Sequence, residues 1–220
     1  MSFNPIIEKQ TMLRRYFLTT VLGLSALGLS SQALSAQQSK FLEGINYQKL
    51  EKPVSIEPYK KKVVEVFFYG CPHCYHLESS LNQWLKNKPK DIDFERMPAV
   101  LDNPNWVFMA RVFYTAKALG ILDKFHETYF NAIQRDGKRI FDIDTLANYC
   151  EQFGIKHKDY VQMFKSFQVS QMVQKAKILT KEYGVDGVPA VIVNGRYRTD
   201  VPMAEGKPQL WHLVNELVNK

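Results

Sequence analysis

Two cysteines stand two residues apart where one pattern of the sequence ends and another begins. Cys71 and Cys74 enclose Pro72 and His73, and Gly70 comes directly before them. A pair with this spacing can close a small-loop disulfide, and a thiolate released from it can exchange with other disulfides. The surrounding residues decide which sulfur carries this chemistry.

The residues after the pair predict a helix whose N-terminus favours a thiolate at Cys71. Unpaired backbone N–H groups and the positive end of the helix dipole stabilise an anion there. His73 adds partial positive charge, and Pro72 suits the first turn because its missing N–H would have no partner. We therefore expect a depressed pKa for Cys71, which makes its sulfur a good leaving group. Cys74, further into the helix, should be more buried and have a more ordinary pKa.

Three other uses of a Cys-x-x-Cys pair have less support. Zinc needs two more ligands nearby, but the remaining thiol is Cys150 and the other histidines form no second pair. A two-residue spacer constrains little chain entropy, which argues against an inert structural disulfide. A c-type haem attachment needs histidine directly after the second cysteine, where Tyr75 stands. We predict a redox pair without metal or cofactor, and Cys150 as a buried thiol that packs as a small hydrophobe.

The change in hydrophobic period predicts the elements that position the pair. Residues 63–69 are mostly β-branched or aromatic and predict a buried strand that leads to the cysteines. Residues 72–87 show helical spacing of apolar side chains. Residues 92–97 alternate and predict a second strand, parallel to the first and reached through the helix.

The remaining patterns complete an α/β fold with one sheet and a helical insertion. Residues 103–167 show helical patterns throughout. Asn194-Gly195 predicts a type I′ hairpin between two strands. The other predicted elements are an edge strand and loop at 45–58, a helix at about 169–183, strands at 189–193 and 197–199, and a last helix at 206–218.

Residues 1–36 have the features of a signal peptide. Arg14 and Arg15 form a basic start, an apolar and small-residue segment follows at 16–29, and Ala36 ends a candidate cleavage site. The apolar segment is short for a transmembrane helix, so a retained membrane anchor is the less favoured alternative. Export implies that the cysteine pair works in an oxidising compartment.

Length and composition exclude some classes of protein. The chain has 220 residues, of which 45% are hydrophobic, and these suffice for one sizeable core with a subdomain. The net charge of +7 is a modest excess. Because no basic stripe accompanies this charge, we expect no nucleic-acid partner.

The sequence resembles a known superfamily at two separated motifs. Cys71-Pro72-His73-Cys74 after a strand, with Gly187-Val188-Pro189 before another, resembles the thioredoxin superfamily. Within it, the segment 67–75 resembles the DsbA family of periplasmic thiol–disulfide oxidases. The resemblance covers residues 41–220. It implies a thioredoxin fold with an inserted helical domain, in which 37–102 and 168–220 form the thioredoxin-like domain and 103–167 form the insertion.

The resemblance also implies roles for residues at the site. Cys71 would be the nucleophilic cysteine, Cys74 the resolving cysteine, and His73 would tune the Cys71 thiolate. Pro189 would follow a cis peptide bond and face the disulfide, which leaves the backbone of Val188 free to pair with a bound substrate strand.

Three charged residues near the pair also have counterparts in the family. Glu65 resembles the buried acid beneath the active site, and Arg96 stands where a lysine often sits as its partner. An ordinary cross-strand salt bridge is the alternative for this pair. Glu78, one turn past Cys74, resembles a second acid near the site. Asp186 departs from a basic residue seen in some members, which leaves the charge of the peptide groove open.

The activity implied is that of a monomeric periplasmic dithiol oxidase. It would introduce disulfide bonds into exported proteins with free thiols, and a DsbB-like, quinone-linked membrane protein would reoxidise it. A disulfide isomerase or reductase of the same fold is one alternative, although 37–70 is too short for the dimerisation domain of isomerase-type relatives. The other is a non-enzymatic chaperone or metal-binding module with Trp106, Phe108 and Tyr114 exposed on the insertion.

Overall fold

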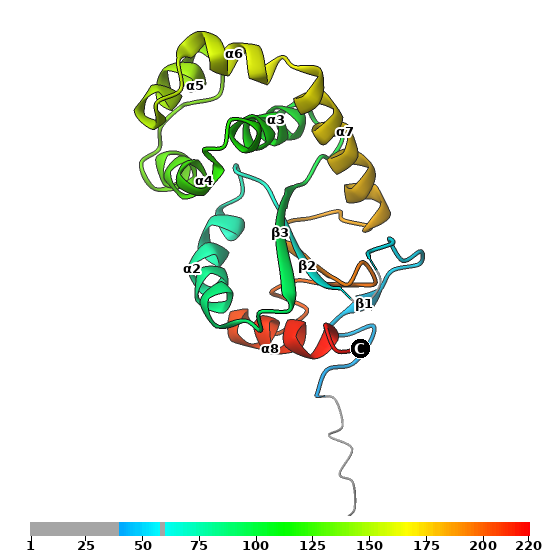
Figure 1. Cartoon of the computed structure of the whole chain (residues 1–220). Coiled ribbons are helices and arrows are strands. Elements are labelled where there is room, and N and C mark those ends of the chain that lie inside the picture. Colours follow the sequence, from blue (N-terminus) through cyan, green and yellow to red (C-terminus); the bar gives the residue numbers. More distant parts are fainter. Residues whose placement is uncertain (1–39, 58–59) are drawn as a thin grey trace, which may run out of the picture. The chain divides into compact units, whose positions relative to one another are not determined.

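A mixed sheet forms the centre of the part of the chain that a computed structural model describes, residues 40–57 and 60–220 (Figure 1). The strand order is β1-β5-β4-β2-β3. β2 pairs parallel with β3 and antiparallel with β4, so the strand that leads to the cysteines is central. The predicted signal peptide lies outside the described residues. The strands are β1 Gln48–Lys49, β2 Lys61–Phe67, β3 Ile92–Pro98, β4 Ala190–Val193 and β5 Tyr197–Thr199.

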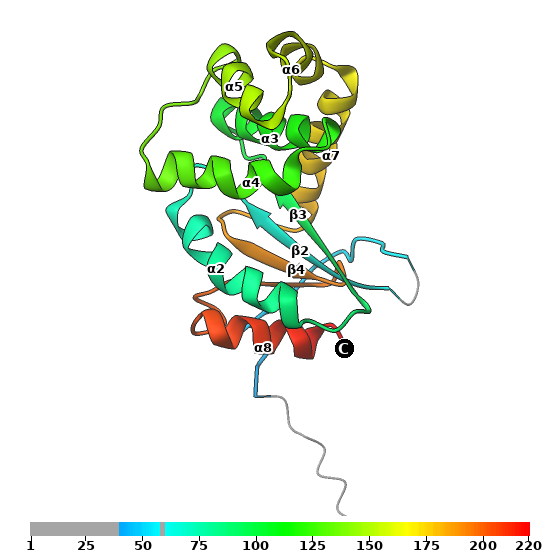
Figure 2. The same cartoon turned by 60° about the vertical axis from the view of Figure 1, so that its left-hand side comes forward.

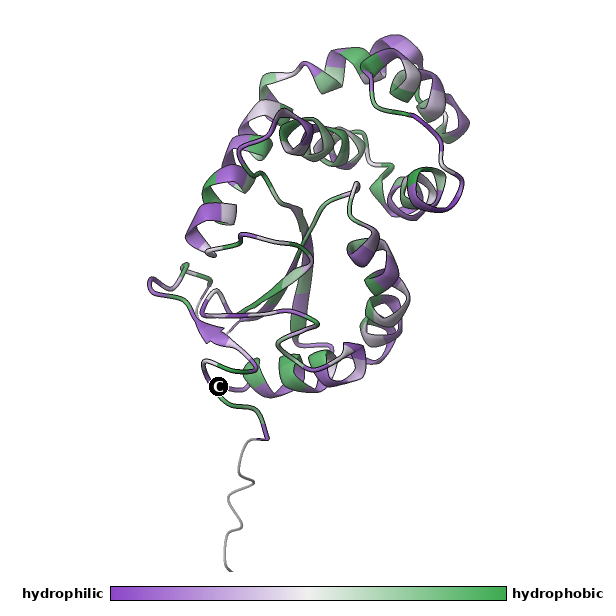
Figure 3. Cartoon of the chain, turned by 180° about the vertical axis from the view of Figure 1, so that it is seen from behind, coloured by the Kyte–Doolittle hydropathy of each residue, from purple (hydrophilic) through white to green (hydrophobic). Residues whose placement is uncertain are grey.

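Helices cover both faces of the sheet, which explains why β2 is apolar along most of its length. α2 (Pro72–Asn87) and α8 (Lys207–Leu217) lie on one face, where Trp84 and Trp211 stack with ring centroids 5.0 Å apart. α7 (Phe167–Glu182) lies on the opposite side in Figure 1. In Figure 3 the helices carry both hydrophobic and hydrophilic segments, as amphipathic helices do.

The predicted helical insertion is present beyond the ends of β2 and β3 (Figure 2). Its buried side chains, such as Phe113 and Tyr129, belong to the same cluster as Val64 on the sheet. The insertion therefore shares one continuous core with the sheet. Its helices are α3 Pro104–Ala118, α4 Leu122–Phe130, the π-helical η1 Asn131–Arg135, α5 Ile143–Cys150, the 3-10 helix η2 Glu151–Phe153 and α6 His157–Phe164.

Most predicted elements are confirmed, and the differences have local causes. β2 ends at Phe67 because Phe68 already begins the turn into α2, where its carbonyl accepts a hydrogen bond from the Cys71 N–H at 3.0 Å. The predicted edge strand shrinks to two residues in β1. The hairpin is confirmed, since Asn194 and Gly195 have φ values of 52° and 60°, as a type I′ turn requires. Within the described ranges, every helix is too short or too polar to span a bilayer.

Thr180 connects α7 to the loop after β3 through hydrogen bonds, and a substitution there tests how much this contact stabilises the fold. Its buried Oγ1 accepts a hydrogen bond from the Val100 N–H at 3.1 Å and donates one to the Ala176 carbonyl at 2.8 Å. We expect Thr180→Val to lower the free energy of unfolding by about 1–3 kcal/mol, because the buried N–H of Val100 loses its partner. Urea unfolding followed by circular dichroism measures this loss.

Thr128→Val is the matched control for this substitution. The Thr128 hydroxyl donates to the Lys124 carbonyl within its own helix and leaves no other buried group without a partner. Its effect should stay below about 0.5 kcal/mol. Equal losses in the two variants would contradict the assigned role of Thr180.

Candidate active site

Cys71 caps the N-terminus of α2. Its backbone is extended, with φ −95° and ψ 115°, and Pro72 follows in the first turn. The Cys71 Sγ accepts a hydrogen bond from the Cys74 N–H at 3.4 Å, as the side-chain oxygen of serine or aspartate does at other helix starts. The predicted joint of strand and helix is confirmed.

The electrostatics of the cap favour a thiolate at Cys71. The pKa of Cys71 is lowered to about 6, mainly by the hydrogen bond with the Cys74 thiol. Partial burial opposes this, while the backbone N–H groups of Cys74 and His73 and the charge of His73 lower the pKa further. The expected depression is present, but its largest cause is the second thiol rather than the helix N-terminus or His73.

Cys74 has the opposite shift. Its side chain is fully buried, and burial raises its pKa far above the ordinary value, with further contributions from Cys71 and from the charge of Glu65. The expectation of burial is confirmed, but the expectation of an ordinary pKa is wrong, since a fully buried thiol resists ionisation. Both cysteines are free thiols in this structure.

The loop before β4 lies against Cys71. The Val188–Pro189 peptide bond is cis, as the resemblance implies. The Cys71 thiol donates a hydrogen bond to the Val188 carbonyl at 3.4 Å, so the two motifs that carried the resemblance meet in space. A cavity of about 450 Å³ opens beside them, lined in part by His73 and His76. Its lining also includes charged residues of both signs: Asp186, Arg198, Asp200 and Lys207.

The charge at Asp186 is compensated locally. Arg198 Nη1 lies 3.3 Å from the Asp186 carboxylate, so the acidic departure from the family pattern does not leave the groove with an unpaired negative charge at this position. Lys207 donates a hydrogen bond to the His76 carbonyl at 2.7 Å. The cavity therefore combines apolar residues, Val188 and Ala190 on either side of Pro189, with charges that are already partly paired.

A second, more apolar cavity lies on the other side of the joint. Its volume is about 650 Å³, and its lining includes Phe68, Gly70, Phe108 and Phe141. Phe68 stacks on Trp106 with ring centroids 4.0 Å apart. A Cβ on residue 70 would clash with the Phe68 ring, so glycine is needed there to leave room for this stack.

Of the three aromatic residues that the chaperone alternative placed on the surface, none is fully exposed. Trp106 and Phe108 are half-buried and Tyr114 is buried. Tyr114 is buried because α3 packs on both the sheet and α7, so it is not available on the surface as this alternative requires.

Beneath the cysteines, the sheet holds a buried acid. Glu65 on β2 is fully buried and lies opposite Arg96 on β3. Arg96 Nε is 3.3 Å from Glu65 Oε2, yet neither carboxyl oxygen has a hydrogen-bond partner among the described residues. Burial raises the pKa of Glu65 to about 8, and the nearby Glu78 raises it as well, against the attraction of Arg96. Burial thus favours the protonated form of Glu65.

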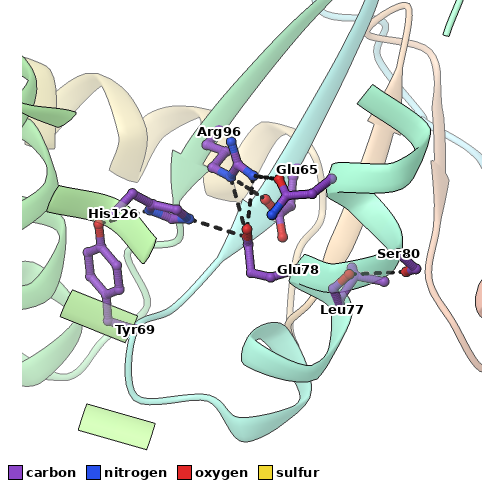
Figure 4. Close-up of polar contacts among 8 residues, drawn as sticks. Glu65, Tyr69, Leu77, Glu78, Ser80, Arg96 and His126 are labelled. Atoms are coloured by element: carbon purple, nitrogen blue, oxygen red, sulfur yellow. Dashed lines mark hydrogen bonds and ion pairs between the residues drawn. The ribbon is translucent and has the colours of Figure 1, made fainter. Parts of the chain in front are cut away.

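Arg96 interacts more closely with Glu78 than with Glu65 (Figure 4). Arg96 donates to the two carboxylate oxygens of Glu78, from Nη2 at 2.9 Å and from Nε at 3.4 Å. His126 Nε2 lies 3.2 Å from Glu78 Oε1, and the Tyr69 hydroxyl lies 3.0 Å from His126 Nδ1. Burial opposes ionisation of Glu78, but the hydrogen bonds and charges of His126 and Arg96 together lower its pKa.

Sequence reasoning assigned Glu65, Arg96 and Glu78 to this region but missed His126. The signal was present, because His126 stands on the apolar side of its helix with Tyr129 and Phe130. Its partners could not be read from that pattern. Within the described ranges, no group of three or more His, Cys, Asp or Glu side chains could hold a metal ion.

The π-helical turn after α4 fastens the insertion to both ends of the cysteine motif. Gln134 Nε2 donates to the Tyr69 carbonyl at 2.8 Å, and the Tyr75 hydroxyl donates to Asn131 Oδ1 at 2.8 Å. π-Helical turns occur often at functional sites. Here the turn follows directly on the regular helix α4.

A strand that leads into a Cys-x-x-Cys helix cap, with a cis-proline loop against the first sulfur, defines a thiol–disulfide oxidoreductase of the thioredoxin fold. Residues 62–218 match the family model described as the DSBA-like thioredoxin domain. The chain belongs to this family, and it is a protein thiol:disulfide oxidoreductase.

Named relatives agree with this assignment. The chain is 36% identical over 197 residues to the thiol:disulfide interchange protein DsbA of Pseudomonas syringae pv. tomato, covering 89% of this chain and 90% of the relative. It is 34% identical over 210 residues to the DsbA of Azotobacter vinelandii, covering 94% and 98%.

Solved structures of the family have the same fold. The crystal structure of Pseudomonas aeruginosa DsbA matches with a TM-score of 0.76 at 32% identity, over 81% of this chain and 93% of that one. Proteus mirabilis DsbA, solved with the non-covalently bound peptide PWATCDS, matches with a TM-score of 0.68 at 27% identity, over 83% and 100%.

The hydrogen bond between the two thiols predicts how Cys71 responds to substitution of its neighbour. Cys74→Ala removes the donor, so we expect the pKa of Cys71 to rise by about one unit or more. Cys74→Ser keeps a donor at the same place and should leave the pKa of Cys71 nearer to the value of the unmodified protein. The pH dependence of alkylation by iodoacetamide measures both. Equal pKa values for Cys71 in the two variants would rule out this cause.

Proposed function

We propose that this protein is a periplasmic dithiol oxidase that introduces disulfide bonds into exported proteins through Cys71 and Cys74. The observation that carries the proposal is the pair of opposite pKa shifts, with Cys71 lowered to about 6 and Cys74 raised. A Cys71 thiolate that is already stable at neutral pH favours the reduced pair. The corresponding disulfide is therefore a strong oxidant.

The reaction transfers two electrons from the substrate to the pair. A substrate thiolate attacks Sγ of Cys71, the bond between Cys71 and Cys74 breaks, and the electron pair passes to the sulfur of Cys74. Glu65 supplies the proton that Cys74 then takes. A second substrate thiolate attacks the substrate sulfur of the mixed disulfide, a disulfide forms in the substrate, and Cys71 leaves as a thiolate.

The residues around Cys71 support substrate binding at this place. The Val188 backbone beside the Cys71 sulfur would form hydrogen bonds with an extended substrate segment, and Pro189 would lie next to that segment. Other proteins bind extended peptides in the same way, by adding them as a strand to an exposed sheet edge. His73 and Pro72 shape the exposed start of α2. The relative from Proteus mirabilis was solved with a cysteine-containing peptide, and we propose unfolded exported chains with free thiols as substrates here.

The cellular setting follows from the same proposal. Residues 1–36 would direct export to the periplasm, an oxidising compartment in which such a pair is useful. A DsbB-like membrane protein would return the pair to the disulfide by passing its electrons to quinone. The protein would act as a monomer without a cofactor or nucleic acid.

A disulfide isomerase of the same fold is the alternative that experiment must separate. An isomerase uses the reduced pair to attack incorrect disulfides, and its thiolate is released when the correct ones form. If this protein is an isomerase, its reduced form, added without an oxidant to a substrate protein with scrambled disulfides, should restore the activity of that substrate protein. An oxidase leaves the scrambled protein largely unchanged.

The direct test is the oxidation of a reduced peptide that contains two cysteines. The disulfide form of the protein should convert an equimolar amount of peptide within the mixing time of a manual assay, because Cys71 is a good leaving group. Cys71→Ser should abolish the reaction. Cys150→Ala is the matched control, since burial raises the pKa of Cys150 to about 12 and a protonated thiol does not exchange. An unreactive disulfide form would refute the proposal.

The lowered pKa of Cys71 also predicts how stability depends on pH. A depressed pKa stabilises the folded reduced protein at pH values above the ordinary thiol value of 9.0, and this gain is lost as the pH falls through about 6. The disulfide form has no such thiolate. The reduced protein should therefore melt at the higher temperature, by a margin that grows between these two pH values. Calorimetry of both forms checks this, and a margin that shrinks with rising pH would contradict it.

A further inference from the structure

Arg96 lies between two buried carboxyl groups that cannot share it equally. It makes two hydrogen bonds to Glu78 and a single 3.3 Å contact with Glu65 that meets no hydrogen-bond geometry. One guanidinium balances one carboxylate, and a second buried carboxylate without hydrogen bonds is strongly disfavoured. The site therefore needs something that decides which carboxyl group carries the negative charge.

The hydrogen bonds of His126 point to that element. An ionised Glu78 can only accept, so the 3.2 Å contact is a hydrogen bond donated by His126 Nε2. Burial lowers the pKa of His126, which favours the neutral ring. A neutral ring that donates from Nε2 accepts at Nδ1, and the Tyr69 hydroxyl donates to it at 3.0 Å. Both ring nitrogens of His126 are thus satisfied in one tautomer.

We propose that His126 is a positioning residue that keeps the negative charge on Glu78 and, through the shared Arg96, the proton on Glu65. The inference rests on the proposed function, in which Glu65 supplies the proton to Cys74. His126 touches neither cysteine in this role. It acts from the helical insertion, across the interface with the sheet.

The surroundings of the cluster agree with this division of charge. Glu65 is faced by Arg96 from β3 and by Glu78 and Cys74 from α2. His126 is faced by Tyr69, Glu78 and Arg96, and by Glu127 of its own helix. A polar cavity of about 320 Å³ is lined by Glu78, Arg96, His126 and Lys117 but not by Glu65. The charged member of the pair thus borders the cavity, while the neutral one lies behind it.

Removing the hydrogen-bond donor of His126 should shift negative charge from Glu78 to Glu65. Without it, the Glu78 carboxylate is less stabilised, and Arg96 is freer to pair with Glu65. Glu65 would then ionise at a lower pH and would no longer be available as an acid at neutral pH. His126→Phe removes the donor but keeps a flat ring among Phe67, Phe113 and Phe130. His126→Gln keeps a donor and an acceptor.

The titration of Glu65 in the oxidised full-length protein tests the proposal without any substrate. The infrared carbonyl band of the protonated carboxyl, assigned with Glu65→Gln, reports its midpoint. We expect the midpoint to fall by about one pH unit or more in His126→Phe and to move by less than about half as much in His126→Gln. A smaller fall in His126→Phe, or an equal fall in both variants, overturns the proposal.

A double-mutant cycle shows whether His126 acts through Glu78. Glu78→Gln removes the competing charge and should itself lower the midpoint of Glu65. Adding His126→Phe to that variant should change nothing further, because the two substitutions act on one path. An undiminished additional fall would overturn the proposal. If His126→Phe does not fold, Tyr69→Phe replaces it, since loss of the hydroxyl frees the tautomer and should shift the midpoint in the same direction.

Kinetics separate this inference from the proposed function. The rate of peptide oxidation should decrease as rising pH removes the proton from Glu65. In His126→Phe this decrease should occur at a lower pH, shifted by the same amount as the infrared midpoint. A shifted infrared midpoint with an unshifted rate profile would show that His126 positions the proton as proposed but that Glu65 does not deliver it to Cys74. A protein without oxidase activity would refute the proposed function and leave the titration result standing.

Discussion

The hydrogen bond between the two thiols links the fold to the chemistry. It exists because β2 delivers Cys71 to the cap of α2 while Cys74 falls on the buried side of the same helix, next to Leu77. The donor must keep its proton for the acceptor to be an anion. This hydrogen bond is the largest cause of the lowered pKa of Cys71, and it adds to burial, which is the largest cause of the raised pKa of Cys74. A helix cap that exposed both sulfurs would lose this asymmetry.

The helical insertion belongs to the site as much as the sheet does. It shares a continuous core with β2, and its π-helical turn binds Tyr69 and Tyr75 on either side of the cysteines. It also contributes His126, the hydrogen-bond partner of a carboxylate on α2. An insertion with a separate core could shift without consequence for the thiols. This one cannot, because the same contacts that dock it also complete the hydrogen bonds of buried polar groups.

The features that could be predicted from the sequence are those set by neighbours in the chain. A proline in the first helical turn, a Cys-x-x-Cys at the strand end and Asn194-Gly195 in a hairpin each depend on a few adjacent residues, and all are present as expected. Glu65 was identified only through the resemblance to the family. His126 and the π-helical turn were not identified, since their partners lie about fifty residues or more away along the chain and are set by tertiary packing. The pKa of Cys74 was misjudged for the same reason, because depth of burial is a property of the whole fold.

The order of the pKa values gives the exchange its direction. Cys71, at about 6, lies below Glu65, at about 8, and Cys74 lies above both. In the proposed reaction, a thiolate released at Cys74 would therefore be a stronger base than the Glu65 carboxylate and would take its proton, whereas a thiolate at Cys71 would be the weaker base. Burial raises both pKa values, because the low-dielectric interior favours the neutral form of Glu65 and of Cys74 alike. In the reduced pair the thiolate is therefore at Cys71, on the helix cap, where an anion costs less desolvation than it would at the fully buried Cys74.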